Sequence, residues 1–131
     1  MLDSISWRIP QKVLYSQFSG TLGLQDFTQM VEATYDMMDK EGRVTGVHSM
    51  LDVSRCEHYG RDMMNLQALR AFTRVHPKTR WIVVIDPAPH PVARFVGLSV
   101  VKLLRLSYSI VKTEPEAMVF IEHIERSTLQ L

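Results

Sequence analysis

Cys56 and His58 are the two residues whose types and spacing come nearest to a catalytic pair, since a reactive thiol needs a base close to it. A single residue separates them within a polar segment, residues 54–59. A cysteine nucleophile also needs an oxyanion pocket, and no motif in this segment supplies one. The same two residues and His90 have the ligand types of a zinc site, but their scattered positions lack its spacing. We interpret the segment as a surface that faces a partner, without a metal or a cofactor.

Asp52 and Asp86 carry the carboxylates that are best placed for chemistry. Each ends an apolar run, so both are expected at the carboxyl ends of parallel strands. If those strands are neighbours, the two carboxylates face one crevice, which is the general ligand position of open α/β sheets. We favour the simpler interpretation that each carboxylate caps the turn or helix after it. An enzyme that uses Asp52, His58 or His90 is a weaker alternative.

The segment from residue 87 to residue 104 is the most unusual part of the chain. Prolines at positions 87, 89 and 91 stiffen the loop around His90, and we favour a stiff turn with a solvated histidine over an anion site. The helix expected at 92–104 is apolar nearly all round, and its charges are all positive. Burial on both sides would make it a dimer interface, a partner groove or the lining of an apolar pocket. Cover by the C-terminal segment explains the pattern equally well, and contact with an anionic membrane surface is less favoured.

The totals are those of one soluble globular domain, residues 1–131. Hydrophobic residues make up 46% of the chain and charged residues 22%, and the net charge of +1 gives no field that would attract nucleic acid. Cys56 is the only cysteine, so no internal disulfide is expected, which suits a reducing cytoplasm. The N-terminal residues lack the apolar core of a signal peptide, and the longest apolar region, 92–106, is too short and too charged to span a bilayer.

The elements that must position these residues follow from apolar periodicity. Strands are expected at 5–9, 13–19, 47–53, 81–85 and 108–111, and helices from Leu24 to just before Gly42, at 62–75, at 92–104 and at 114–124. The order β-β-α-β-α-β-α-β-α indicates an α/β domain with a mostly parallel, mixed five-stranded sheet flanked by helices. The opening hairpin adds one antiparallel strand near an edge.

Three segments of this chain have a recognisable pattern. They are residues 18–27, where a strand passes through glycine into the first helix, residues 51–54, Leu-Asp-Val-Ser, and the acidic start and apolar continuation of the last helix at 114–121. In these segments the chain resembles the SpoIIAA-like family, within the broader STAS-like fold of anti-sigma-factor antagonists. The resemblance implies a STAS-like fold that binds a partner or a small apolar ligand. Antagonists of this group carry a phosphorylated Asp-Ser-Ser-Gly motif, but here no serine or threonine lies between Ser54 and Thr73. The phosphorylation switch therefore does not carry over.

These observations predict a non-enzymatic interaction or regulatory module, expected as a homodimer or bound to another protein. A carrier of a small apolar ligand or lipid, in a pocket between the second and third helices, is the alternative. The polar loops after the third and fourth strands and the surface of the third helix are the expected binding surfaces. The candidate residues on them are Asp52, Ser54, Arg55, His58, Tyr59, Asp86, His90, Arg94, Leu98 and Val101.

Overall fold

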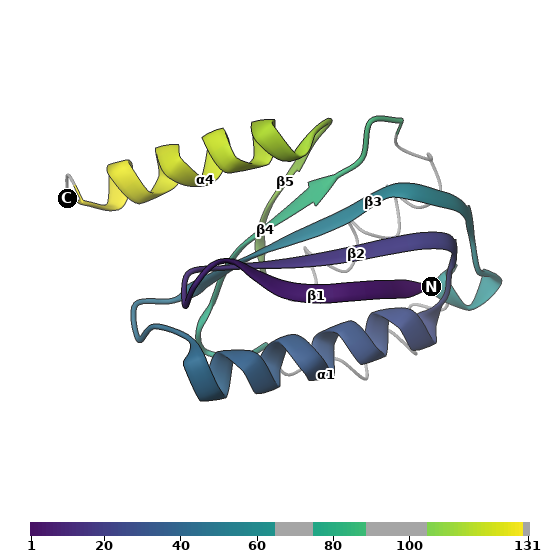
Figure 1. Ribbon diagram of the computed structural model, residues 1–131, viewed down its shortest axis with the longest axis horizontal. Coiled ribbons are helices and arrows are strands. Elements are labelled where there is room, and N and C mark those ends of the chain that lie inside the picture. The colour runs from purple at the N-terminus through teal and green to yellow at the C-terminus, as the bar shows by residue number, and fades with distance from the viewer. Residues whose placement is uncertain (65–74, 89–104, 130–131) are drawn as a thin grey trace.

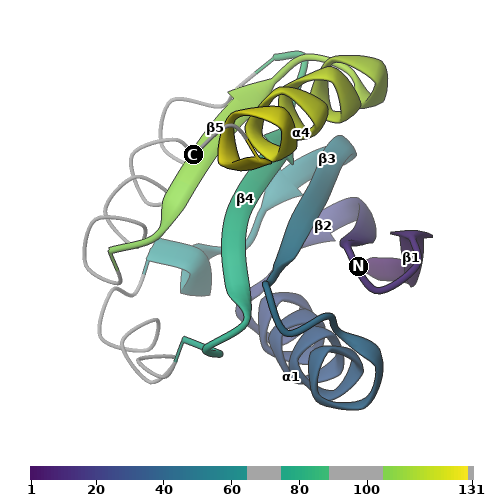
Figure 2. The same cartoon turned by 90° about the vertical axis from the view of Figure 1, so that its left-hand side faces the viewer.

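The computed structural model describes residues 1–64, 75–88 and 105–129. A five-stranded sheet lies at its centre, and the two α-helices of the described residues pack on opposite faces of it (Figures 1 and 2). The strands are β1 (Leu2–Ile9), β2 (Val13–Leu22), β3 (Val47–Tyr59), β4 (Thr79–Ile85) and β5 (Ser107–Val111).

The strands lie side by side in chain order, from β1 at one edge to β5 at the other. β1 and β2 form an antiparallel hairpin, and each later strand pairs in parallel with the one before it. This arrangement confirms the predicted mixed, mostly parallel sheet and the antiparallel opening strand at an edge.

The two described helices are α1 (Leu24–Glu41) and α4 (Glu114–Leu129). α1 begins where the carboxylate of Asp26 accepts the backbone amide of Gly23 at 2.9 Å, a cap that satisfies an amide at the helix start. α4 begins with two glutamates in its first turn, at the positive end of the helix dipole, and runs five residues beyond its predicted end. Of the helix predicted at 62–75, the structure describes a 3₁₀ turn, η1 (Arg61–Met64), and a non-helical Val75. The helix predicted at 92–104 lies outside the described residues.

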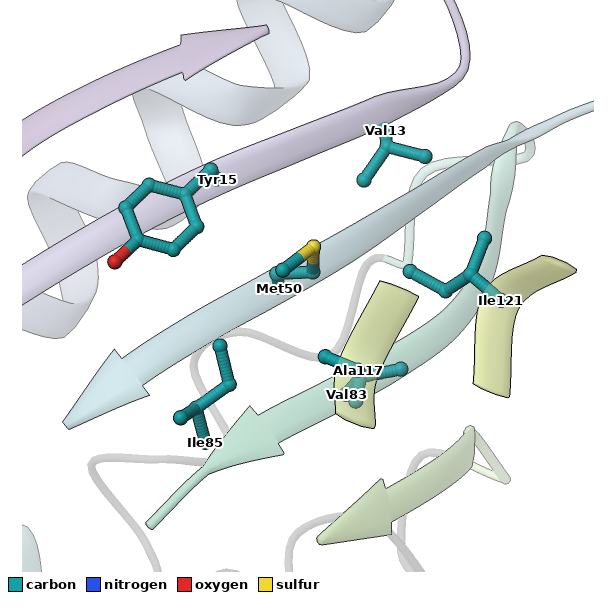
Figure 3. Close-up of a cluster of buried hydrophobic side chains, with 7 residues drawn as sticks. All are labelled: Val13, Tyr15, Met50, Val83, Ile85, Ala117 and Ile121. Atoms are coloured by element: carbon teal, nitrogen blue, oxygen red, sulfur yellow. The ribbon is translucent and has the colours of Figure 1, made fainter. Parts of the chain in front are cut away.

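Apolar side chains fill both sides of the sheet. Under α4, Ala117 and Ile121 of the helix pack on inward residues of three adjacent strands (Figure 3); those are Val13, Tyr15, Met50, Val83 and Ile85. On the α1 face, two further clusters form around Met38 and Met30 of the helix. In β4, Val83 and Ile85 are buried under α4, whereas Ile82 and Val84, on the other face of the strand, are half-buried.

The predicted end of the third strand at Val53 is wrong. β3 continues to Tyr59 and stays paired with β2 as far as Leu22, so residues 54–59 are strand and not loop. Two register shifts interrupt this pairing, each with one extra residue on β3, which is the geometry of a β-bulge. Each bulge breaks the period-two alternation from which a strand is recognised, and the segment therefore resembled a polar loop.

Candidate functional site

The candidate site lies where β2 and β3 continue past the core cluster under α4. Asp52 follows Met50 by two residues and therefore shares its face of β3. Beyond Asp52 the bulged part of β3 pairs with the end of β2. We call residues 19–22 of β2 and residues 54–59 of β3 together the ribbon end.

Asp52 is buried, and donors from two strands surround its carboxylate. Its Oδ1 atom accepts the amide of Ser54 at 3.0 Å and the hydroxyl of Ser54 at 2.6 Å, and its Oδ2 atom accepts the hydroxyl of Tyr15. Burial alone would raise the pKa of Asp52, but the hydrogen bonds from Ser54 and Tyr15 outweigh it and hold the pKa below its ordinary value. The carboxylate is therefore ionised and fully engaged at neutral pH.

Tyr15 joins this carboxylate to the rest of the sheet. Burial and the hydrogen bond to Asp52 raise the pKa of its hydroxyl, so the hydroxyl stays a donor. The guanidinium of Arg8, on β1, lies 4.5 Å from the ring centroid of Tyr15 and forms an ion pair with Glu114 at the start of α4. A single group of contacts thus connects β1, β2, β3 and α4.

The outer residues of the ribbon end are polar and exposed in pairs. Ser54 and Arg55 form the first exposed pair, and Glu57 and His58 form the second, because each bulge turns two successive side chains outward. Gly20 lies opposite Cys56 in this pairing and has a φ of 63°, a left-handed value that glycine adopts without strain.

The inward residues of the ribbon end lie on the α1 face. Cys56 and Tyr59 pack with Phe18 and Leu22 of β2. Burial raises the pKa of the Cys56 thiol to about 11. Burial, followed by the negative charge of Asp86, raises the pKa of Tyr59 to about 12. The thiol is therefore protonated at neutral pH, which is the unreactive form for a nucleophile.

Asp52 and Asp86 belong to different polar groups. β3 and β4 are neighbours, as the crevice hypothesis required, but Asp52 contacts Tyr15 and Ser54, whereas the charge of Asp86 acts on Tyr59 and Cys56. The Oδ1 atom of Asp86 accepts the amide of Ala88 at 3.1 Å, and Asp52 likewise accepts an amide two residues on. Both carboxylates therefore make the local capping contacts that the simpler interpretation expected.

The structure brings together some of the candidate residues predicted from the sequence and does not describe the others. Asp52, Ser54 and Arg55 gather at the first bulge, and His58 and Tyr59 lie four to five residues further along the same strand. The remaining candidates, His90, Arg94, Leu98 and Val101, lie outside the described residues. Across residues 1–64, 75–88 and 105–129, no group of three metal-ligating side chains comes together, and no helix is long and apolar enough to cross a membrane.

A second polar group, which sequence reasoning missed, holds α4 at the other end of the sheet. His48 is buried, and its Nδ1 atom accepts the amide of Trp81 at 3.3 Å while its Nε2 atom lies 2.8 Å from Oε1 of Glu125. Arg43 binds both oxygens of the same carboxylate. Burial lowers the pKa of His48, so the ring is neutral and donates from Nε2. Residues 77 positions apart in sequence make this contact, and no local pattern reveals it.

The mixed five-stranded sheet and the helices on its two faces form a SpoIIAA-like fold. No protein-family model and no curated protein sequence matches the chain. Among solved structures, the unphosphorylated anti-sigma-factor antagonist SpoIIAA is similar over 94% of this chain and 96% of its own, with a TM-score of 0.57 and 13% identity. An uncharacterized DUF3478-family protein with a SpoIIAA-like fold, from Shewanella loihica PV-4, is similar over 89% of this chain and 91% of its own, with a TM-score of 0.56 and 10% identity. The fold predicted from the sequence is confirmed.

Proposed function

We propose that this protein is a non-enzymatic interaction module that binds a partner protein, or a second copy of itself, through the ribbon end. The observation that carries the proposal is the display of Arg55, Glu57 and His58 on a paired strand beyond the core. The backbone of these residues is hydrogen-bonded in a sheet, so little conformational entropy is lost when a partner docks. The similarity in fold to an anti-sigma-factor antagonist supports the same class of function.

The chemistry of the neighbouring groups supports a binding role over catalysis. Asp52 accepts hydrogen bonds on both carboxylate oxygens, which leaves it poorly suited to act as a base. Cys56 packs among apolar residues and is protonated, while His58 is exposed. The polar groups of this region therefore stabilise the ribbon end.

The charges at the ribbon end favour a protein partner over a polyanion. Arg55 and Glu57 carry opposite signs and are both exposed, and Arg61 and Asp62 repeat this mixture in η1. A surface of mixed sign gives orientation and specificity against a complementary protein surface. Nucleic acid, in contrast, is bound by a surface of one positive sign.

The carrier alternative and the surface of the predicted third helix remain predictions. Both depend mainly on segments 65–74 and 89–104, outside the described residues, so Arg94, Leu98 and Val101 stay candidates for an interface. In the part of the chain that the structure describes, no observation favours an apolar cavity lined by Leu, Val, Met and Phe.

Site-specific photo-crosslinking tests the proposal. A benzoylphenylalanine in place of His58 should give a crosslinked species on irradiation in the native cells, and mass spectrometry of the joined peptide distinguishes a second copy from another protein. The matched control has the same amino acid in place of Glu122, an exposed residue on the outer side of α4. Equal adducts from both positions, or none from position 58, would contradict binding through the ribbon end.

Native mass spectrometry of the unmodified protein gives the companion measurement. A homodimer that the Arg55→Glu variant converts to monomer identifies the ribbon end as the self-association surface. A monomer that crosslinks to a different protein identifies a heterologous partner. A dimer unaffected by Arg55→Glu and uncrosslinked at position 58 assigns the interface to another surface.

A further inference from the structure

β1 forms one edge of the sheet, and its outer side is open among the described residues. The strand order runs from β1 to β5, and no described element lies beyond β1 (Figure 2). An edge strand offers its unpaired backbone amides and carbonyls to another strand. The phase of the hydrogen-bond ladder between β1 and β2 determines which backbone groups of β1 are available.

The backbone groups that point outward belong to Ile5 and Trp7. Hydrogen-bonded and non-hydrogen-bonded pairs alternate along an antiparallel ladder. The amide of Ser19 donates to the carbonyl of Met1 at 2.9 Å, so every second residue of β2, counted from Ser19, bonds to β1. Ile5 and Trp7 lie opposite two of the intervening residues of β2, so their amides and carbonyls point away from β2. In the described part of the chain, no backbone bond outside the ladder involves either residue.

Half-buried apolar side chains lie beside these backbone groups on the α1 face. Ile5 and Trp7 pack with Met37 of α1 on one of the two clusters of that face, and all three remain partly exposed. Cover of such a strip by a second strand removes apolar surface from water and is favourable. On the opposite face of β1, Ser6 is exposed and pairs with Tyr15, and its small side chain leaves room for a neighbouring strand.

The charges of β1 favour a second copy of the same strand in antiparallel orientation. Asp3 near its start and Arg8 near its end are both exposed and have opposite signs. An antiparallel copy brings each charge near its opposite, whereas a parallel copy would bring like charges together. Arg8 already pairs with Glu114, so these charges set the orientation and add little affinity. A register shift lies at each charged residue, which confines regular pairing to the residues between them.

From these features we propose that two copies of this chain pair β1 against β1, antiparallel about Ser6, so that two five-stranded sheets become one continuous sheet. In this register the amide and carbonyl of Ile5 bond to those of Trp7 in the second copy, and the outward groups of both residues are satisfied. Ser6 lies opposite its own counterpart, at the Cα separation of about 4.5 Å that is typical of a non-hydrogen-bonded pair.

This pairing leaves the ribbon end uncovered. The last pair between β1 and β2 joins Leu2 to Phe18, and the ribbon end begins one residue later on β2. Because the two copies run in opposite directions, their ribbon ends lie at opposite ends of the continuous sheet. The dimer thus presents two ribbon ends, and its formation does not depend on the proposed interaction function.

Disulfide trapping tests the register. In a Cys56→Ala background, Ser6→Cys places two thiols opposite each other, within the Cα separation of about 4.4–6.8 Å that a disulfide spans. A mild oxidant should convert this variant to a covalent dimer. Ser4→Cys is the matched control, because position 4 is also exposed but lies roughly 13 Å from its own counterpart in this register. Equal crosslinking at positions 4 and 6, or none at position 6, would overturn the proposal.

The oligomeric state gives an independent measurement. Sedimentation velocity of the natural protein should show a dimer at micromolar concentration. Ser6→Lys puts like charges opposite each other and should weaken the dimer about tenfold or more. Ser127→Lys makes the same change at an exposed position of α4 and should leave the dimer unaffected. A natural protein that stays monomeric, or a dimer on which the two variants act equally, would contradict pairing through β1.

Arg55→Glu separates this inference from the proposed function. The change alters the ribbon end and should leave the β1-paired dimer intact. A dimer that Arg55→Glu dissociates and Ser6→Lys does not would assign self-association to the ribbon end and overturn pairing through β1. Photo-crosslinking at position 58 tests the ribbon end itself, so either proposal can fail without the other.

Discussion

The hydroxyl of Tyr15 donates a hydrogen bond to the carboxylate of Asp52, and both side chains are buried. Asp52 lies opposite Gln17 in the last regular pair before the first bulge of β3, and it also binds the hydroxyl and amide of Ser54 within that bulge. The contact thus joins the apolar cluster under α4 to the point where the ribbon end begins. We infer that this contact holds β2 and β3 in register at the point where the ribbon end begins.

Removal of the Tyr15 hydroxyl should destabilise the fold. Tyr15→Phe leaves the buried carboxylate of Asp52 without one of its donors, and a hydrogen bond to a charged group contributes about 1.5–3 kcal/mol. The free energy of unfolding, measured in urea, should fall by about that amount. Tyr108→Phe on β5 is the control, because in the described residues its hydroxyl makes no hydrogen bond and the change should cost little. Similar losses in both variants would count against a specific role for the Tyr15 contact.

The Asp52 carboxylate should make stability sensitive to acid. The pKa of Asp52 is lower in the folded state than in the unfolded chain. As the pH falls, the unfolded chain therefore takes up a proton before the folded protein does, and the free energy of unfolding decreases. The stabilisation is complete above the unfolded value, about 3.9, and disappears as the pH drops through the lower folded value. The difference in unfolding free energy between the natural protein and Asp52→Asn, measured from pH 7 to pH 2, should therefore shrink below about pH 4. A constant difference would contradict this assignment.

Glu125 should anchor the C-terminal half of α4. Glu125→Gln removes the charge that pairs with Arg43 and accepts from His48, at a cost of about 1–2 kcal/mol for a half-buried contact. Hydrogen exchange of amides in the second half of α4 should quicken, whereas Glu122→Gln on the exposed side should not change it. Unchanged exchange in both variants would show that apolar packing alone holds the helix.

His48 should report the same contact in a proton titration. Burial lowers its pKa, and the hydrogen bond and charge of Glu125 oppose that shift. Its pKa in a magnetic-resonance titration should thus lie below 6.5 and fall further in Glu125→Gln. Because the unfolded chain takes up the proton first, stability should decrease as the pH drops below about 6.5. A His48 pKa above 6.5 would reverse this sign.

The Cys56 thiol should react slowly in the folded protein. A pKa of about 11 leaves roughly a hundredfold less thiolate at pH 8 than the ordinary value of 9.0 does. Reaction with a disulfide reagent should be slower than that of free cysteine by about that factor and should become fast in denaturant. Rapid reaction of the native protein would favour the thiol chemistry that the neighbouring residues argue against.

Gly20 should be required for the ribbon end. Its φ of 63° is unfavourable for alanine, and Gly20→Ala should cost about 1 kcal/mol in unfolding free energy. Gly23→Ala is the matched control, since its φ is −112° and a Cβ atom would meet no atom closer than 3.7 Å. Gly20→Asn should recover part of the loss, because asparagine tolerates the left-handed region. Equal effects at Gly20 and Gly23 would exclude the backbone argument.

Local patterns in the sequence were sufficient for most of the architecture. Alternation and helical periodicity depend on neighbours in the chain, so α1, β4 and β5 were predicted within about two residues of their observed bounds. The two hairpin strands and α4 were predicted in the right places, but each extends three to five residues beyond its predicted bounds. The capping contacts of Asp52 and Asp86 were predicted for the same reason, since each carboxylate reaches an amide two residues away.

The tertiary structure decided the features that depend on contacts between distant residues. The bulges in β3 exist only in relation to the register of β2, so residues 54–59 were mistaken for a loop. Tyr15 meets Asp52 from 37 positions away, and Arg43 meets Glu125 from 82. A sequence pattern records which residues can be buried or charged, whereas strand pairing and helix docking determine which of them meet.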